Sequence, residues 1–365
     1  MPIPSVALTG PILNYKLENL LNPKKSTWKL AILSATLVVG SLSAFAADRK
    51  IYVANEGAGT VSVIDGASFK VTRHIAVGAG AHNVQVSTDG KLTWVTNNGV
   101  PKAAASAKGH SGAGHGAMAQ AGEVWAIDTE TDAVVARVVV GKHPAHVVVS
   151  ADSRWAYVTN GGDNTVSVVD TASLKVADTL PTGEYPHGLR LSPDGKQLYV
   201  ANLKGNTVSV IDTESRKETG QIPVGKSPAQ VGFTSDGLLA FVSLSQEASV
   251  AVIDSATRKV IRKVSVGEVP IQLYATPDNR FLIVANQGSR KNPGNTVSVI
   301  DLANFSTRQI QVGSGAHGVV VGTDGRHAYV SNLYANTVTV IDVQTSTTVA
   351  TVPVGAGPNG ISVTP

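Results

Sequence analysis

A segment of about 40–45 residues recurs seven times between Asp48 and Pro365, and a repeat of this length indicates a fold built from equivalent structural units. Each copy contains a core of the type Tyr-Val-Thr-Asn, a run of the type NTVSVID that ends in Asp, and a third run that ends in Gly. The alternation of apolar and polar residues in these runs predicts strands. The seven cores begin at Tyr52, Trp94, Tyr157, Tyr199, Phe241, Ile283 and Tyr329.

A fourth run precedes each core and ends in a turn such as Ser-Pro-Asp-Gly at 192–195, where Pro and Gly suit the dihedral angles of a turn. Four short strands per unit are typical of a β-propeller blade. The chain after Asp48 starts inside a unit, and it stops at Pro365 with the run that this unit lacks. We therefore predict an all-β, seven-bladed β-propeller over residues 48–365, whose last blade is closed by pairing N- and C-terminal strands.

Composition limits the chemistry that such a ring can carry. Aromatic residues make up only 5% of the chain, which suits a core of small and β-branched side chains. The chain has no Cys, and this excludes disulfides, thiolate zinc sites, iron–sulfur clusters and covalently attached haem. His, Asp, Glu and Met remain as side-chain metal ligands.

Residues 1–47 have the order of a secretory signal peptide. Lysines precede an apolar run at 30–42, and Ala-Phe-Ala follows at 44–46. A retained anchor is the alternative, although the run is short for a bilayer. We expect a periplasmic or secreted protein with no membrane span after leader removal. Much of the net charge of +4 lies in this leader, so nucleic acid is not expected as a partner.

One polar residue per repeat stands where the innermost strand is predicted to start, beside the central channel. Four of them are histidines, and neutral imidazole is a common ligand of copper and zinc. We expect these histidines to hold a metal and the amides to bind a small ligand; the alternative is that each side chain only satisfies the backbone of its own turn. The seven residues are His82, His146, His187, Gln230, Gln272, His317 and Asn359.

A Gly- and Ala-rich insertion at 99–122 is expected to emerge on the same face. It contains His110, His115 and Met118, whose imidazole and thioether groups suit a soft metal such as copper. The insertion is interpreted as a metal-capture loop or lid, or as a surface loop without chemistry. His143, in the turn before His146, is a further candidate ligand-binding residue.

The Tyr-Val-Thr-Asn cores, NTVSVID runs and VG-x-x-P turns resemble the YVTN-family β-propeller repeat proteins, which are exported proteins of bacteria and archaea. The resemblance covers residues 48–365 and implies the propeller fold. It implies no single activity, because related propellers include stand-alone binding modules, lactonase-like enzymes, the haem-binding propeller of nitrite reductase and the copper-binding propeller of nitrous oxide reductase. Function has to be argued from the site.

Three functional hypotheses follow from the ring of polar residues. The first is a binding or interaction module, not an enzyme, that holds a small ligand, a metal or a periplasmic protein partner. The second is a copper or zinc metalloprotein, metalloenzyme or metal carrier that uses the channel histidines. The third is a lactonase-like hydrolase, which the lack of acidic residues among the seven positions disfavours.

Overall fold

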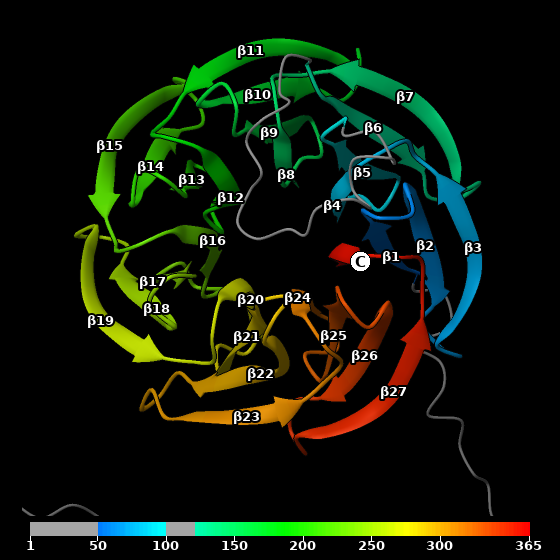
Figure 1. Ribbon diagram of the computed structural model, residues 1–365. Coiled ribbons are helices and arrows are strands. Elements are labelled where there is room, and N and C mark those ends of the chain that lie inside the picture. Colours follow the sequence, from blue (N-terminus) through cyan, green and yellow to red (C-terminus); the bar gives the residue numbers. More distant parts are fainter. Residues whose placement is uncertain (1–49, 100–120) are drawn as a thin grey trace, which may run out of the picture. The chain divides into compact units, whose positions relative to one another are not determined.

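The computed structural model of the protein describes residues 50–99 and 121–365. Seven four-stranded antiparallel sheets stand around a common axis as the blades of a propeller (Figure 1). These residues form strands and turns with no helix, which confirms the predicted all-β, seven-bladed fold. It follows that no helix capable of spanning a membrane occurs in the part of the chain that is described. The predicted leader at 1–47 and residues 100–120 of the predicted insertion lie outside it.

The strands of the first four blades, each blade from the inside outwards, have the following bounds. They are β28 (Pro358–Val363), β1 (Lys50–Asn55), β2 (Thr60–Asp65) and β3 (Lys70–Ala76); β4 (Ala81–Val86), β5 (Leu92–Asn97), β6 (Glu123–Asp128) and β7 (Ala133–Val139); β8 (Pro144–Val149), β9 (Trp155–Asn160), β10 (Thr165–Asp170) and β11 (Lys175–Pro181); and β12 (Pro186–Leu191), β13 (Gln197–Asn202), β14 (Thr207–Asp212) and β15 (Lys217–Pro223).

The remaining three blades follow the same order. They are β16 (Pro228–Phe233), β17 (Leu239–Leu244), β18 (Ser249–Asp254) and β19 (Lys259–Ser265); β20 (Pro270–Ala275), β21 (Phe281–Gly288), β22 (Pro293–Asp301) and β23 (Thr307–Gln311); and β24 (Ala316–Val321), β25 (His327–Asn332), β26 (Thr337–Asp342) and β27 (Thr347–Pro353).

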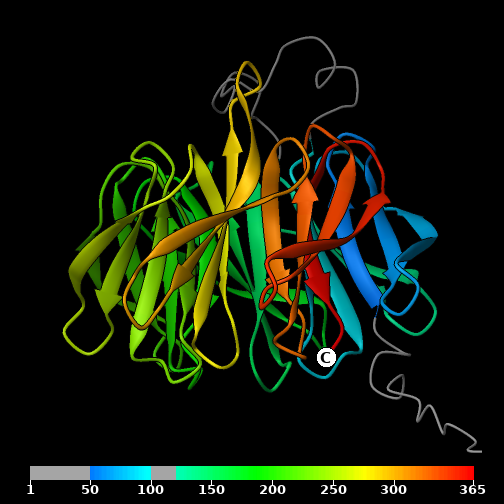
Figure 2. The same ribbon diagram turned by 90° about the horizontal axis from the view of Figure 1, so that it is seen from below.

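The ring is closed by β28, which pairs with β1 and supplies the innermost strand of the first blade. Two backbone contacts extend this pairing: Lys50 N donates to Thr364 Oγ1 at 3.0 Å, and Thr364 N donates to Lys50 O at 3.0 Å. The predicted closure by N- and C-terminal strands is therefore confirmed. Figure 2 shows that β28 ends on one face, here called the lower face, while the β21–β22 hairpin projects from the opposite, upper face.

In five blades the core Asn makes the same two side-chain hydrogen bonds and lies against the Gly of the turn that leads into the blade. Asn55 Nδ2 donates to Thr60 Oγ1 at 3.1 Å and to Ser62 Oγ at 2.8 Å. Gly355 lies against this amide, and a Cβ at that position would come within 2.6 Å of Asn55 Nδ2. Asn in the core and Gly in the turn therefore recur together, because a side chain at the Gly position would collide with the Asn amide.

The third core residue joins neighbouring blades when it carries a hydroxyl group. Thr96 Oγ1 accepts from Asn83 N at 3.0 Å within its own blade and donates to Ala145 O at 2.7 Å on the next blade. These buried bonds fix the start of each innermost strand on the upper face. Equivalent pairs of bonds are made by Thr159, Ser243 and Ser331.

Candidate functional site

A β-bulge at the start of each innermost strand sets which side chain faces the axis. In β4, Ala81 pairs with Asn97, but Val84 pairs with Val95, so β4 contains one extra residue. The other six innermost strands show the same register shift at the same place. Because the bulge breaks the normal alternation, the polar residue stands second in the strand at His82, His187, His317 and Asn359, and third at His146, Gln230 and Gln272.

The four predicted histidines come from four blades and meet near the axis. The ring centroids of His146 and His187 are 4.8 Å apart, and those of His82 lie 5.7 and 5.5 Å from them. His317 is the outer member, with its ring centroid 6.3 Å from that of His82. In His82, His146 and His187, one ring nitrogen each lies within 4.8 Å of the others, so the structure groups these three as potential metal ligands.

Hydrogen bonds fix the orientation of two of these rings. His187 Nδ1 lies 2.9 Å from Ala229 O, and because a carbonyl oxygen only accepts, Nδ1 carries the proton and Nε2 keeps a lone pair. Asn359 Nδ2 donates to His82 Nδ1 at 3.2 Å, and in this arrangement the proton of the neutral ring is on Nε2. Its Nε2 is buried and has no hydrogen-bond partner among the described residues, as is true of His146 Nε2.

Burial keeps three of the histidines, His146, His187 and His317, uncharged at neutral pH. Loss of hydration, together with the proximity of His82, lowers the pKa of His187 to about 4 and that of His317 to about 3. Burial and the neighbouring His187 likewise lower the pKa of His146 well below its usual value. The neutral His187 ring, whose lone pair is on Nε2, can ligate a metal without first losing a proton.

Sequence reasoning missed one acidic residue at this site, Glu56. Its N–H donates to Gly357 O at 2.8 Å, which fixes the backbone beside the axis. Its Oε2 accepts from Asn359 Nδ2 at 2.9 Å, and its Oε1 accepts from Asn98 Nδ2 at 3.3 Å. Glu56 directly follows a core Asn, and comparing that position across repeats would have found it, since the six equivalents are Asn98, Gly161, Leu203, Ser245, Gln287 and Leu333.

The two predicted glutamines are buried and bonded to backbone. Gln230 Oε1 accepts from Val231 N at 3.1 Å, and Gln272 Oε1 accepts from Val319 N of the next blade at 3.3 Å. Their carbonyl oxygens thus accept hydrogen bonds from the backbone, as the second interpretation of the polar residues expected. Gln272 Nε2, however, is buried without a hydrogen-bond partner in the described part of the protein, and it remains available to a ligand.

The remaining candidates are placed less fully. His143 stands in the turn before β8, where its ring centroid is 5.8 Å from that of Tyr185. His110, His115 and Met118 lie outside the described residues. The strands that flank their segment do reach the upper face, because Asn97 pairs with both Ala81, which precedes His82, and Glu123.

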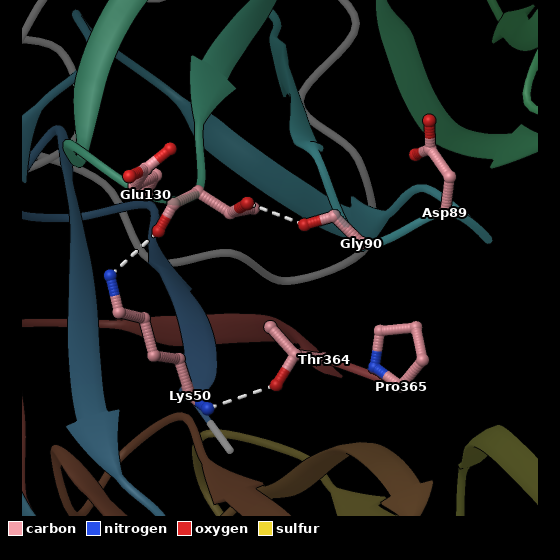
Figure 3. A pocket seen from close by; sticks show the side chains of 7 residues that line it. Lys50, Asp89, Gly90, Glu130, Thr364 and Pro365 are labelled. Carbon is pink, nitrogen blue, oxygen red and sulfur yellow. Dashed lines mark hydrogen bonds between the residues drawn. The ribbon is translucent and has the colours of Figure 1, made fainter. Parts of the chain in front are cut away.

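A shallow pocket of about 280 Å³ on the lower face belongs to ring closure (Figure 3). Lys50 Nζ donates to Thr129 O at 2.6 Å and to Asp132 Oδ1 at 3.0 Å, which ties the first blade to the second. Thr129 Oγ1 in turn donates to Gly90 O. These contacts satisfy the polar groups by which the two blades are joined.

A family model described as YNCE-like beta-propeller matches the chain twice, over residues 113–239 and 239–365. The two matches adjoin, and together they cover more than half of the sequence. No curated protein matches the chain.

Several solved structures share the fold. Hydrazine synthase of Kuenenia stuttgartiensis is 23% identical, with a TM-score of 0.66 over 77% of this chain and 89% of that one. PpgL, a periplasmic gluconolactonase of Pseudomonas aeruginosa, is 20% identical, with a TM-score of 0.67 over 87% and 99%. The dihydro-heme d1 dehydrogenase NirN is 17% identical, with a TM-score of 0.61 over 86% and 74%. At these identities the likeness concerns the fold alone.

Proposed function

The chain belongs to the YNCE-like beta-propeller family, and we propose that it is a binding protein whose ligand is a copper or zinc ion held by the axial histidines. The histidine cluster, defined as His82, His146, His187 and His317, is the binding site in this proposal. The propeller supplies a rigid frame, because each histidine comes from a different blade.

The grouping of His82, His146 and His187 carries the proposal. Their ligand atoms lie within 4.8 Å of one another, whereas nitrogens around a tetrahedral zinc ion stand about 3.3 Å apart. Side-chain rotations that move each ring nitrogen by about 1 Å would bring the three nitrogens to this spacing. Buried nitrogens without hydrogen-bond partners cost free energy, and a metal ion would supply the missing partner.

The donor set favours copper or zinc over other ions. Neutral imidazoles suit these metals, whereas magnesium and calcium prefer oxygen ligands. His317 stands near enough to His82 to serve as a fourth ligand. Glu56 Oε2 lies 3.5 Å from His82 Nδ1, where an outer carboxylate can orient a metal-binding imidazole.

The test is elemental analysis of protein purified from the exported fraction without chelator. We expect about one equivalent of copper or zinc in the wild type and its loss in the variant in which all four cluster histidines are changed to Ala. The matched control is the double variant His74→Ala, His327→Ala, which removes two histidines outside the cluster and should retain the metal. Absence of bound metal in the wild type, even after loading with Cu²⁺ and Zn²⁺, would refute the proposal.

A lactonase-like hydrolase is the second candidate, and Glu56 favours it. A carboxylate close to a metal-bound water can act as a general base, and Glu56 Oε2, 3.5 Å from His82 Nδ1, is the carboxylate available at this site. The shared fold with PpgL, described as a gluconolactonase, is compatible with this chemistry. Turnover of gluconolactone by the metal-loaded protein, and its loss in Glu56→Gln, would support it; no turnover with either metal would eliminate it.

We also propose that the protein is exported. The order of lysines, apolar run and Ala-Phe-Ala in residues 24–46 supports this, as does the likeness in fold to a gluconolactonase described as periplasmic. N-terminal sequencing of protein from the periplasm should give a start near Ala47 or Asp48. Recovery of the uncleaved chain from the membrane fraction would instead indicate a retained anchor.

A further inference from the structure

A second tier of residues lies further along the innermost strands, towards the lower face. Each member pairs with the first residue of the core in its own blade. Arg190 is the charged member of this tier, and no acidic residue accompanies it there. The seven residues are Gln85, Val148, Arg190, Gly232, Tyr274, Val320 and Ser362.

The Arg190 side chain extends across the blade that follows its own. It starts from β12, and its Cζ lies 5.3 Å from the ring centroid of Tyr274 on β20. The intervening blade contributes β16, whose tier residue is Gly232 and has no side chain to stand in the way (Figure 1). A contact between blades that are not neighbours places the guanidinium group towards the axis of the ring.

This guanidinium group has no counter-ion among the residues that the structure describes. Within the described residues, Arg190 makes no salt bridge and its side chain makes no hydrogen bond, although it is partly buried. Most other half-buried cations on the protein are paired; Lys50, for example, contacts Asp132 at 3.0 Å. Partial burial of an unpaired charge costs free energy, and a ligand of opposite charge would recover it.

Arg190 also lies close to the histidine cluster. It follows His187 by three positions on the same strand, which corresponds to about 10 Å along the backbone. The guanidinium group therefore places an unpaired positive charge beneath the cluster, and this charge favours an anion there.

We propose that Arg190, oriented by Tyr274, binds a small oxyanion, a carboxylate or a phosphate, beneath the histidine cluster. A guanidinium group presents parallel N–H donors that match two oxygens of either anion, and its stacking on an aromatic ring fixes the plane of this fork. This site uses none of the cluster histidines. It goes beyond the proposed metal site and can be tested without metal.

The test is calorimetric titration of the chelator-treated full chain with inorganic phosphate and, separately, with acetate. We expect saturable binding of at least one anion, and the comparison shows which class is preferred. Arg190→Gln should weaken binding at least tenfold, and Arg190→Lys, which retains the charge but loses the fork, should fall between the two. The matched control is Arg262→Gln, because Arg262 stacks on Phe305 at 5.0 Å on an outer strand. This control should bind as the wild type does.

Two outcomes contradict the proposal. One is the absence of saturable binding of either anion by the folded wild type. The other is equal affinity of wild type and Arg190→Gln. If Arg190→Gln fails to fold, the comparison of wild type with Arg190→Lys decides, and equal affinity of those two for both anions overturns the assignment. Neither outcome bears on the metal site, since the protein is freed of metal and of chelator before the titration.

Discussion

Glu56 and His82 face each other at the upper face of the ring, with Oε2 of the first 3.5 Å from Nδ1 of the second. Asn359 lies between them and contacts both, at 2.9 Å from Glu56 Oε2 and 3.2 Å from His82 Nδ1. Through these contacts the carboxylate and the amide fix the orientation of the His82 ring.

Glu56→Gln should therefore lower the affinity for Cu²⁺ or Zn²⁺ by about 10–100-fold without unfolding the protein. Competition with a chelator of known affinity measures the change, and Glu56→Asp should restore part of it. Glu184→Gln, which removes another upper-face carboxylate, is the control. Unchanged affinity in Glu56→Gln would show that the carboxylate does not act through His82.

Stability should fall in mild acid because the cluster resists protonation. Well above pH 6.5, the rings of His187 and His317 are neutral in both the folded and the unfolded chain and contribute no pH dependence. At lower pH these two histidines become protonated in the unfolded chain. In the folded protein His187 stays neutral down to about pH 4 and His317 down to about pH 3. The free energy of unfolding should drop by about 1.4 kcal/mol per pH unit for each such histidine.

Denaturant titrations of the metal-free protein between pH 7 and pH 5 measure this slope. His317→Gln removes one of the groups and should reduce the slope by about one proton. His74→Gln, on an outer strand, should leave it unchanged. Equal slopes in the wild type and in His317→Gln would contradict the prediction.

Removing the hydroxyl contact between blades beside the histidine cluster should lower the free energy of unfolding by about 2 kcal/mol. Thr159 Oγ1 accepts from His146 N at 3.0 Å and donates to His187 O at 2.7 Å, so Thr159→Val leaves two buried backbone groups without partners. Thr179→Val, on the exposed side of β11, is the control and should change stability by less than about 0.5 kcal/mol. Thermal unfolding of both variants provides the measurement.

Val269 is held in an unfavourable backbone conformation. Its φ is +50°, a value that β-branched residues rarely adopt, and the turns of three other blades have Gly80, Gly315 and Gly357 at the same position. Val269→Gly should relieve this strain and raise the free energy of unfolding by about 1 kcal/mol. A lower melting temperature in this variant would show that the partly buried side chain contributes more through packing than it costs in strain.

The propeller could be predicted from the sequence because each blade repeats the same local signals. The alternation in Thr207–Asp212 predicts a strand, and the seven copies leave one way to close the ring. The sequence also predicted that the four histidines lie together, because each stands at the start of the innermost strand of its repeat. Which strand position faces the axis could not be predicted, because the bulge breaks the two-residue period and lets both His146 and His187 point inward.

The contacts of Glu56 were beyond sequence reasoning for a different reason. Glu56 and Asn359 are 303 residues apart, and they meet only because β28 pairs with β1. The contact of Arg190 with Tyr274 could not be predicted for the same reason, because a whole blade separates the two residues. Side-chain contacts of this kind depend on the diameter of the complete ring and on which neighbouring residues lack side chains. The sequence of one repeat contains neither piece of information.

The strand that closes the ring gives the site a dependence on folding history. Asn359 stands on β28, the last of the described strands in chain order, whereas Glu56 directly follows β1 and His82 lies on β4. Until β28 pairs with β1, Asn359 is not held beside Glu56 and His82. The complete network between Glu56, Asn359 and His82 can form only in a chain that has reached its final shape, so its formation reports that assembly is finished.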